Sequence, residues 1–349
     1  MPEYTTAFFV AVGAALVLTP AVIYLAAKTG AMDAPDARKV HKKPIPRIGG
    51  IGIYTAFMIA VMMVMDSGIF AGEIAYDTAG LLFGGSLIAL LGVADDYKNL
   101  PAKVKLVGQI LAAAVTVVIF DVRIDFVTDP FGDYLYLEYL AVPVTLFWFV
   151  GLTNTVNLID GLDGLAAGVA VIASVTIFLV ALEGNIIPVA VLTAALAGAA
   201  FGFLYYNFNP ARIFMGDSGS MFLGFMLAGI SVIGAVKSTA TIALIVPILA
   251  LGLPIMDTTF AIVRRYRGGV PIFKPDKGHL HHRLLDLGFT QRQAVLLMYV
   301  ISAVLGLCAV ALTEVSPPVA MVIVLTVLVA VFAGAKKLGI FRMNKPVGR

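Results

Sequence analysis

Long apolar segments dominate this 349-residue chain and restrict what it can fold into. Hydrophobic residues make up 60% of the sequence and charged residues only 13%. A soluble domain, by contrast, carries roughly 25% charged residues and about 45–50% apolar ones. A run of about 20 apolar residues is long enough to cross the hydrocarbon core of a bilayer as a helix. We therefore predict an all-α polytopic membrane protein that forms a single domain, residues 1–349.

The apolar pattern predicts about eleven transmembrane helices. They cover residues 6–27, 49–65, 78–94, 104–120, 140–156, 164–182, 186–205, 218–235, 240–263, 293–312 and 317–334. The ninth segment contains Pro247, Pro254 and Asp257, so we expect a kinked or broken helix there.

The basic residues predict the side of the membrane on which each loop lies. All 24 lysines and arginines except Arg123 and Lys237 fall in alternate loops or in the C-terminal tail. Loops rich in lysine and arginine stay in the cytoplasm, which predicts an outside N-terminus and a cytoplasmic C-terminus. The outer loop after residue 120 is acidic, and its alternation from Asp133 to Glu138 predicts a short periplasmic β-hairpin. The expected location is the cell membrane, with multiple passes.

Two adjacent carboxylates, Asp95 and Asp96, end the third predicted span. They can be ordinary solvated residues, but the C-terminus of a helix disfavours anions. We therefore expect the pair to need a cation, either a metal ion or a lysine.

A second polar group lies between the fifth and sixth predicted spans and consists of Asn154, Asn157, Asp160 and Asp163. The last three are spaced three apart, which would place them on one face of a helical turn. Oxygen ligands of this kind suit magnesium. The alternative is a polar turn in which an aspartate caps a helix, which would explain only one of the two carboxylates.

Asp217 enters the eighth predicted span between Gly216 and Gly219, shortly after Phe214. Backbone N–H groups at a helix N-terminus can bind an anion or orient a carboxylate. The alternative for Asp217 is a simple helix N-cap.

The longest inner loop holds three of the chain's four histidines, in the run His279, His281, His282 and Arg283. No partner ligands with zinc spacing accompany them. Imidazole and guanidinium groups donate to phosphoryl oxygens, so the run predicts a phosphate-binding loop, with a solvated loop as the alternative. The first inner loop, 28–48, holds a further basic group, and the alternative to a functional role is a loop that only sets topology or binds anionic lipid headgroups.

Together these loops supply acids for a divalent cation and bases for phosphates at one face of the membrane. The arrangement fits a reaction between a water-soluble phosphate and a lipid phosphate. A phosphate-recognising transporter or flippase is the alternative of a different class. Transporters tend to place acids near the middle of the membrane and to contain internal repeats, whereas here the motifs lie at one face.

At these motifs, over about residues 28–290, the sequence resembles the polyprenyl-phosphate N-acetylhexosamine-1-phosphate transferase superfamily, glycosyltransferase family 4. It is most similar to the bacterial undecaprenyl-phosphate GlcNAc-1-phosphate transferases. The similarity rests on Arg38-Lys-Val-His41, on the run from Pro46 to Gly50, and on His-Leu-His-His-Arg. The MurNAc-pentapeptide branch usually has methionine where Ile48 stands.

The resemblance implies transfer of GlcNAc-1-phosphate from UDP-GlcNAc to undecaprenyl phosphate, with release of UMP. It implies Mg²⁺ as cofactor, with Mn²⁺ as a substitute, at the cytoplasmic membrane face, in a step that initiates a cell-envelope glycan. The same chemistry on UDP-MurNAc-pentapeptide or another UDP-HexNAc stays open. Membrane lipid and a second copy of the chain are the further expected partners, and no nucleic acid is expected.

The resemblance also implies roles by motif position. Asp217 corresponds to the main metal ligand, helped by Asn157. The candidate catalytic residues are Asp95, Asp96, Asp160 and Asp163. The candidate substrate-binding residues are Lys105 at the donor phosphates, Asn99 near the nucleoside, Phe214 on uracil, His279, His281, His282 and Arg283 at the pyrophosphate, and Asn154, Asp33 and Arg47.

Two questions of mechanism stay open at this stage. Asp95 either accepts a residual proton or only orients the attacking phosphate. Direct displacement and double displacement through an aspartyl intermediate are both open. Direct displacement is favoured, because positioning and charge neutralisation account for most phosphoryl-transfer catalysis.

Overall fold

The computed structural model describes residues 1–34, 44–128, 134–237, 245–269 and 278–337. The helices are α1 (Glu3–Thr29), α2 (Gly50–Val64), α3 (Glu73–Lys98), α4 (Ala102–Ala114), α5 (Ala141–Ile159), α6 (Leu165–Glu183), α7 (Ile187–Asn207), α8 (Gly216–Lys237), α9 (Ile245–Ala250), α10 (Gly252–Arg267), α11 (Leu280–Asp286), α12 (Gln291–Ala311) and α13 (Pro317–Lys337). Two short antiparallel strand pairs accompany them, β1 (Met32–Asp33) with β2 (Ile45–Pro46) and β3 (Phe126–Thr128) with β4 (Tyr134–Tyr136).

Within the described ranges, ten helices are long and apolar enough to cross a membrane. Each corresponds to one of the predicted spans, and α4 reaches its full length through a π-helical turn at Val115–Ile119. The prediction of an all-α polytopic membrane protein is therefore confirmed. The predicted hairpin is also present, as β3 and β4.

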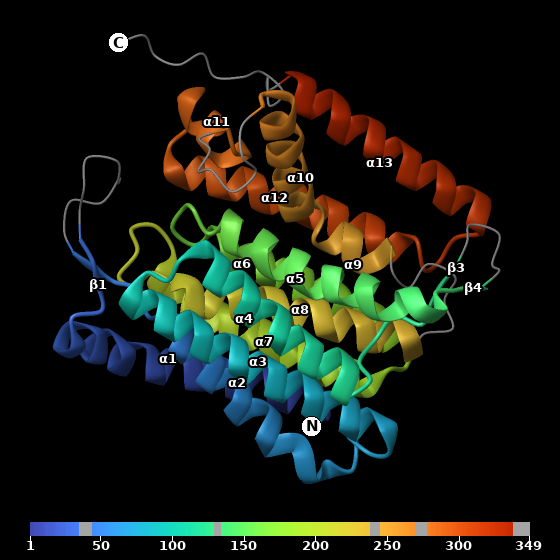
Figure 1. Ribbon diagram of the computed structural model, residues 1–349, viewed down its shortest axis with the longest axis horizontal. Helices are drawn as coiled ribbons and strands as arrows, with labels where there is room; N and C mark the ends of the chain where they lie inside the picture. The colour runs from blue at the N-terminus through green and yellow to red at the C-terminus, as the bar shows by residue number, and fades with distance from the viewer. Residues whose placement is uncertain (35–43, 129–133, 238–244, 270–277, 338–349) are drawn as a thin grey trace.

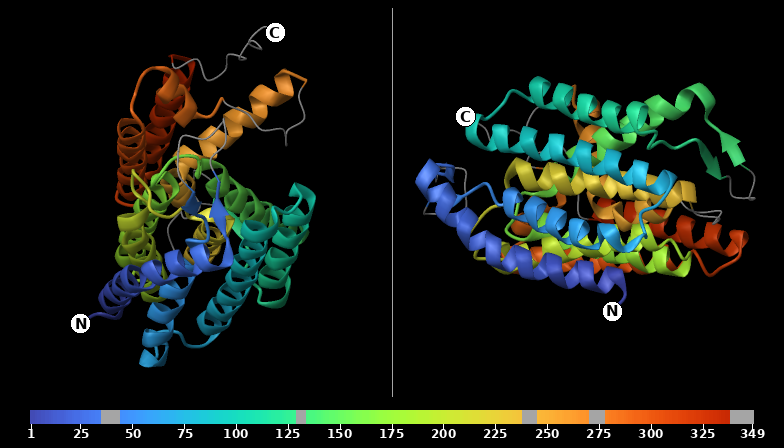
Figure 2. Two further views of the ribbon diagram at one scale, coloured as in Figure 1. Left: turned by 90° about the vertical axis from the view of Figure 1, so that its left-hand side faces the viewer. Right: turned by 90° about the horizontal axis from the view of Figure 1, so that it is seen from below.

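The ninth predicted span is not one helix. It is divided between α9 and α10, and neither piece is among the candidate spans found in the described part of the chain. Pro254 explains the break, because proline has no N–H to donate to the carbonyl of Ala250, the last residue of α9. Pro254 itself lies in the first turn of α10, where a missing N–H costs nothing. After the break α10 runs across the direction of the other long helices (Figure 1) and leans away from them (Figure 2).

The long helices lie side by side with α8 at the centre of the bundle (Figure 1). Helices α2, α3, α5, α6 and α7 all pack against α8, and most of α8 is buried. By contrast, α13 lies at the edge of the bundle and is largely exposed (Figure 2).

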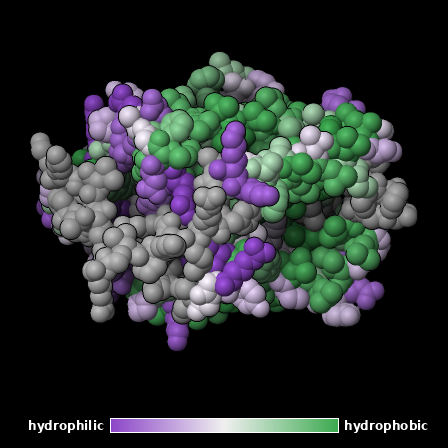
Figure 3. Space-filling model, turned by 90° about the horizontal axis from the view of Figure 1, so that it is seen from above, coloured by the Kyte–Doolittle hydropathy of each residue, from purple (hydrophilic) through white to green (hydrophobic). Residues whose placement is uncertain are grey.

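The outer surface of the bundle is apolar. Figure 3 shows apolar side chains over much of one face, with hydrophilic side chains gathered towards the left-hand end. Large exposed apolar residues such as Phe147, Leu307 and Phe332 come from three different spans. Lipid is the solvent that such a surface requires.

Glycines allow α3 to approach α8 closely. A Cβ atom on Gly92 would lie 2.3 Å from the Cα atom of Ser218, and one on Gly50 of α2 would lie 2.0 Å from the amide nitrogen of Gly219. Small residues at such contacts let helix backbones meet. The contact brings the C-terminal end of α3 to the N-terminal end of α8, where the acidic motifs lie.

Replacing Gly92 with alanine is therefore expected to destabilise the bundle by about 1–3 kcal/mol, because the obstructing atoms are backbone. Thermal unfolding in detergent measures the effect. The matched control is Gly13→Ala in α1, where an added Cβ meets nothing within 4 Å. Equal unfolding temperatures for the two variants would show that α3 and α8 do not depend on this contact.

Candidate active site

Asp96, near the end of α3, holds the first turn of α8. Its Oδ1 accepts a hydrogen bond from the amide of Asp217 at 2.8 Å, and its Oδ2 accepts one from the amide of Ser218 at 3.1 Å. The first N–H groups of a helix have no partner within the helix, so a carboxylate from another helix supplies one. Gly216, with φ of 71°, makes room, because a Cβ there would lie 2.6 Å from both carboxylate oxygens of Asp96.

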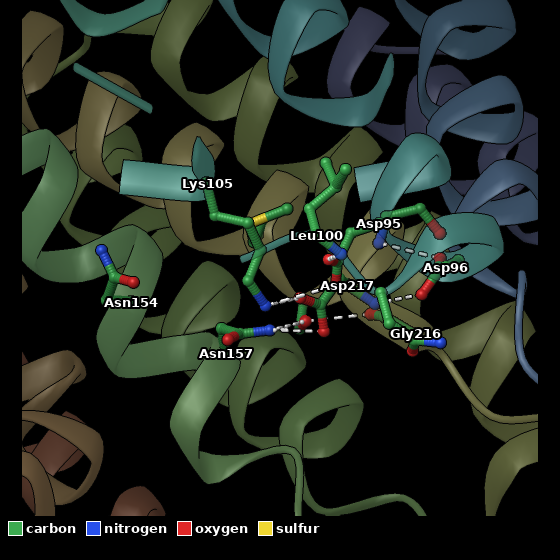
Figure 4. A network of polar contacts seen from close by, with 12 residues as sticks. Asp95, Asp96, Leu100, Lys105, Asn154, Asn157, Gly216 and Asp217 are labelled. Carbon is green, nitrogen blue, oxygen red and sulfur yellow. Dashed lines mark hydrogen bonds and ion pairs between the residues drawn. The ribbon is translucent and has the colours of Figure 1, made fainter. Parts of the chain in front are cut away.

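The carboxylate of Asp217 consequently points into the site and not back onto its own helix. Its Oδ2 contacts the Lys105 Nζ at 2.7 Å, and its Oδ1 accepts from the Asn157 Nδ2 at 3.1 Å. Lys105 also contacts the Asp95 Oδ2, at 3.2 Å. Figure 4 shows these groups converging from α3, α4, α5 and α8. The N-cap alternative for Asp217 is wrong, because Asp96 performs that function.

The C-terminal end of α3 fixes the position of Asp95. The helix ends at Lys98 and is followed by Asn99, which has a left-handed φ of 47°; the Asp95 Oδ1 accepts the amide of Leu100 at 2.6 Å. Arg47 covers the helix end, donating to the carbonyls of Asp96 at 2.6 Å and Asp95 at 3.3 Å, and to the Asn99 Oδ1 at 2.9 Å. A cation is favourable at a helix C-terminus, so Arg47 stabilises the end of α3. Arg47 and Asn99 together hold the backbone that carries the acidic pair.

The cation expected at the acidic pair is Lys105. Its ammonium lies between the carboxylates of Asp95 and Asp217. Among the described residues there is no group of three or more His, Cys, Asp or Glu side chains that could hold a metal. Magnesium needs no such cage, because it is held by one or two carboxylates together with substrate phosphates. The oxygen-bearing set of Asp95, Asp217 and Asn157 fits that ion and does not fit zinc.

Two residues that the sequence pattern did not single out complete this region. The Ser220 Oγ accepts from the Asn157 Nδ2 at 2.9 Å. Gln109, buried within α4, accepts from the Asn154 Nδ2 at 2.6 Å. A glutamine in an apolar span is the sequence signal that could have identified Gln109. The side chain of Asn154, on α5, thus contacts α4 and lies apart from the Asp217 carboxylate (Figure 4).

The shared helical face expected for Asn157, Asp160 and Asp163 is wrong, because α5 ends at Ile159. Asp163 lies in the following turn, where its Oδ2 accepts from the Asn209 Nδ2 at 2.9 Å and from the amide of Ala211 at 3.0 Å. It therefore ties the α5–α6 turn to the α7–α8 loop.

Asp160 lies at the end of α5, in the same turn as Asp163. Burial raises the pKa of Asp160 to about 8, and the charges of Asp217, Asp96 and Asp163 add to the shift. The shift favours the protonated form of this carboxyl group.

The first inner loop reaches the site through its second strand. Asp33 is in β1 and pairs with Ile45 of β2, which is followed by Arg47. Phe214 donates its amide to the carbonyl of Pro46 at 2.7 Å and accepts the amide of Gly49 at 3.0 Å. The loop before α8 and the loop before α2 are thus joined by backbone hydrogen bonds beside Asp217.

The histidine run forms the start of α11 and approaches the α5–α6 turn. His281 is buried, and a Cβ on Gly161 would lie 2.6 Å from its Nε2. Its ring stacks on His279 with centroids 5.8 Å apart, and lies 4.2 Å from the ring of His282. Burial lowers the pKa of His281 to about 3, and His282 adds to the lowering. His281 is therefore neutral near pH 7, so any positive charge in this run comes from its neighbours.

Asp96→Ala tests whether Asp96 supports α8. Losing a helix cap costs about 0.5–2 kcal/mol, and two amides at the start of α8 lose their acceptor. We expect a lower unfolding temperature in detergent for this variant, with Asp96→Asn in between because its amide oxygen can still accept. Asp66→Ala, at an exposed position of the opposite end, is the control. An unfolding temperature equal to that of the unaltered chain would refute the capping role.

The comparisons with known proteins decide the family. Residues 78–235, from α3 to α8, match the family described as glycosyl transferase family 4. A probable undecaprenyl-phosphate N-acetylglucosaminyl 1-phosphate transferase of Bacillus subtilis is 42% identical over 313 residues, which cover 89% of this chain and 86% of the relative. The chain belongs to glycosyl transferase family 4. The resemblance noted from the motifs is thereby confirmed.

Two further relatives of this family carry related names. A decaprenyl-phosphate N-acetylglucosaminephosphotransferase of Mycolicibacterium smegmatis is 39% identical, over 79% of this chain and 73% of its own. An undecaprenyl-phosphate alpha-N-acetylglucosaminyl 1-phosphate transferase of Escherichia coli is 28% identical, over 81% of this chain and 76% of its own. The family 4 match includes the acidic pair, Lys105, Asn157 and Asp217.

Proposed function

We propose that the chain transfers GlcNAc-1-phosphate from UDP-GlcNAc to undecaprenyl phosphate, giving GlcNAc-pyrophosphoryl-undecaprenol and UMP. The observation that carries the proposal is the convergence of Asp95, Lys105, Asn157 and Asp217 from four helices at one end of a membrane bundle. The printed names of the family 4 relatives support the polyprenyl-phosphate acceptor and the N-acetylglucosamine group.

The place of the site suits one soluble and one lipid substrate. The acidic pair lies at the end of a span, on the side to which the sequence assigns the loops that hold most of the basic residues. By the positive-inside rule this end faces the cytoplasm, where nucleotide-sugars are dissolved and where the phosphate of a polyprenyl lipid lies at headgroup depth. A cell-membrane location with a cytoplasmic site is part of the proposal, and association of two copies stays a prediction.

In the proposed step, an oxygen of the lipid phosphate attacks the β-phosphorus of UDP-GlcNAc. A new phosphorus–oxygen bond forms as the bond from the β-phosphorus to the bridging oxygen breaks, and UMP leaves with that oxygen. Both substrates are anions, so their approach has to be neutralised. Asp217, with Asn157, would hold Mg²⁺ on the donor pyrophosphate, and the ion would supply charge neutralisation there. We propose direct displacement, because no covalent intermediate is needed for positioning and charge neutralisation.

The protein groups have distinct parts in this proposal. Lys105 contacts Asp217, so its ammonium would bind the donor phosphates that are held there. His282 and Arg283 belong to the run that packs against the α5–α6 turn through His281, and they would bind the pyrophosphate. Asp95, held by Lys105 and by the amide of Leu100, orients the attacking phosphate or takes its residual proton. The remaining three side chains hydrogen-bond to the backbone near these groups and hold it in place; they are Asp96, Asp163 and Arg47.

A panel of donors tests the proposed substrate. The purified chain in detergent is given undecaprenyl phosphate and Mg²⁺ with UDP-GlcNAc, UDP-GalNAc or UDP-MurNAc-pentapeptide, and UMP release is measured. We expect the highest kcat/KM with UDP-GlcNAc. A preference for UDP-MurNAc-pentapeptide would keep the reaction and change the sugar. No UMP release from any donor would overturn the transferase proposal and favour a transporter.

A further inference from the structure

A buried carboxylate outside the site described above holds the histidine run in place. Asp257 is on α10, the second half of the broken ninth segment, and only 3% of it is exposed. Its Oδ1 accepts the amide of Leu280 at 2.8 Å, and its Oδ2 contacts the His279 Nδ1 at 2.9 Å. His279 is buried as well. A buried charge must be paired and hydrogen-bonded, and here both of its oxygens are used on one short stretch of chain.

This contact fixes where the imidazole of His279 carries its hydrogen. An ionised carboxylate only accepts hydrogen bonds, so an ionised Asp257 requires the Nδ1 of His279 to be the donor, whether the ring is neutral or protonated. In the neutral ring the Nε2 is then the nitrogen with the free lone pair. The hydrogen bond made by one ring nitrogen sets the state of the other.

We propose that Asp257 is a positioning residue, which fixes the orientation and tautomer of His279 and thereby places the turn from His281 to Arg283 against the α5–α6 turn. The proposal rests on the function proposed above, because it assigns that turn to the donor pyrophosphate. Asp257 acts through His279 and does not itself contact a substrate.

Packing contacts connect the Asp257–His279 pair to the α5–α6 turn. His279 stacks nearly parallel on His281, with 9° between the ring planes, and His281 in turn lies against Gly161. On the other side, a Cβ on Gly278 would lie 2.3 Å from the guanidinium carbon of Arg264. Asp257 and Arg264 are seven residues apart on α10 and therefore share a face of that helix. One face of α10 thus supports the start of α11 at two points.

The test is Asp257→Asn, which keeps the size of the side chain. When its amide oxygen accepts from Leu280, its Nδ2 faces the His279 Nδ1, and a neutral ring must then move its hydrogen to Nε2. We expect kcat for UMP release from UDP-GlcNAc to fall by about 10–100-fold, the range for residues that orient a functional group. We expect KM for UDP-GlcNAc to change less than kcat, since the turn that Asp257 positions would stabilise mainly the charge that develops on the pyrophosphate in the transition state.

A spectroscopic readout separates positioning from simple support of the fold. With only four histidines in the chain, nitrogen NMR of protein labelled in histidine can be assigned by single substitutions. In the unaltered protein His279 should show its hydrogen on Nδ1, and in Asp257→Asn on Nε2. The matched control is Asp286→Asn, the same change at an exposed position of α11, which should alter neither kcat nor the spectrum. The double variant Asp257→Asn with His279→Gln should lose no more activity than His279→Gln alone.

The outcomes are distinguishable from failure of the proposed function. If the unaltered protein releases no UMP, the proposed function fails, while the NMR measurement still tests the tautomer. A neutral His279 with its hydrogen on Nε2 in the unaltered protein would overturn the positioning proposal, even if Asp257→Asn does not fold. Wild-type kcat in a folded Asp257→Asn would overturn it too.

Discussion

Asp217→Asn is expected to reduce kcat/KM for UMP release by about a hundred- to a thousandfold, the cost of removing one charge-stabilising group from an enzyme site. The carboxylate of Asp217 is the group on which Lys105 and Asn157 both converge. Asparagine keeps the shape of the side chain but loses the charge that would hold a divalent cation. The measurement is UMP release by purified protein over a range of Mg²⁺ concentrations.

The control for this variant is Asp66→Asn, which makes the same change at an exposed site far from the cluster and should keep full activity. The capping of α8 uses the backbone amide of Asp217 and not its side chain, so the variant should unfold at nearly the same temperature as the unaltered protein. Full activity in a folded Asp217→Asn would remove the assignment of Asp217 as the metal-holding residue.

Lys105→Met should lower kcat/KM by about a hundredfold or more, because its ammonium is the cation that faces both carboxylates and the proposed donor phosphates. Methionine keeps much of the length of the side chain and removes the charge. Asp95 and Asp217 then lack their common partner, so Mg²⁺ should raise the unfolding temperature of Lys105→Met more than that of the unaltered protein.

Lys103→Met provides the matched comparison, since Lys103 is exposed on the same helix. It should keep its activity and show the same response to Mg²⁺ as the unaltered chain. A Lys105→Met variant with unchanged kcat/KM would show that the ammonium contributes to structure alone.

The arrangement of spans could be predicted from the sequence because bilayer thickness sets their length. Ten of the predicted segments are found as long apolar helices in the described part of the chain. The break in the ninth was also foreseeable, since the lack of an N–H on Pro254 is a local property of the chain. The direction that α10 takes after the break was not, because it depends on packing against other helices (Figure 2).

The residue types of the site could be predicted, but not how they divide their tasks. Asp95 and Asp96 are neighbours in sequence, yet one contacts Lys105 and the other caps α8. That division depends on Gly92, which lets α3 approach α8, and on the left-handed Gly216. Such contacts join residues far apart in the sequence, so no periodicity reveals them. The pairing of Asp257 with His279 escaped prediction for the same reason.

The central claim is that a sugar phosphate, and not a sugar alone, passes to the lipid. The most direct test uses UDP-GlcNAc labelled in its β-phosphate, with the purified protein, undecaprenyl phosphate and Mg²⁺. The account predicts that the label appears in the organic phase as a pyrophosphoryl lipid, with unlabelled UMP in the water, and that Asp217→Asn slows the appearance of both by about a hundred- to a thousandfold. Label that stays in the water as UDP would show transfer of the sugar alone and would contradict the account.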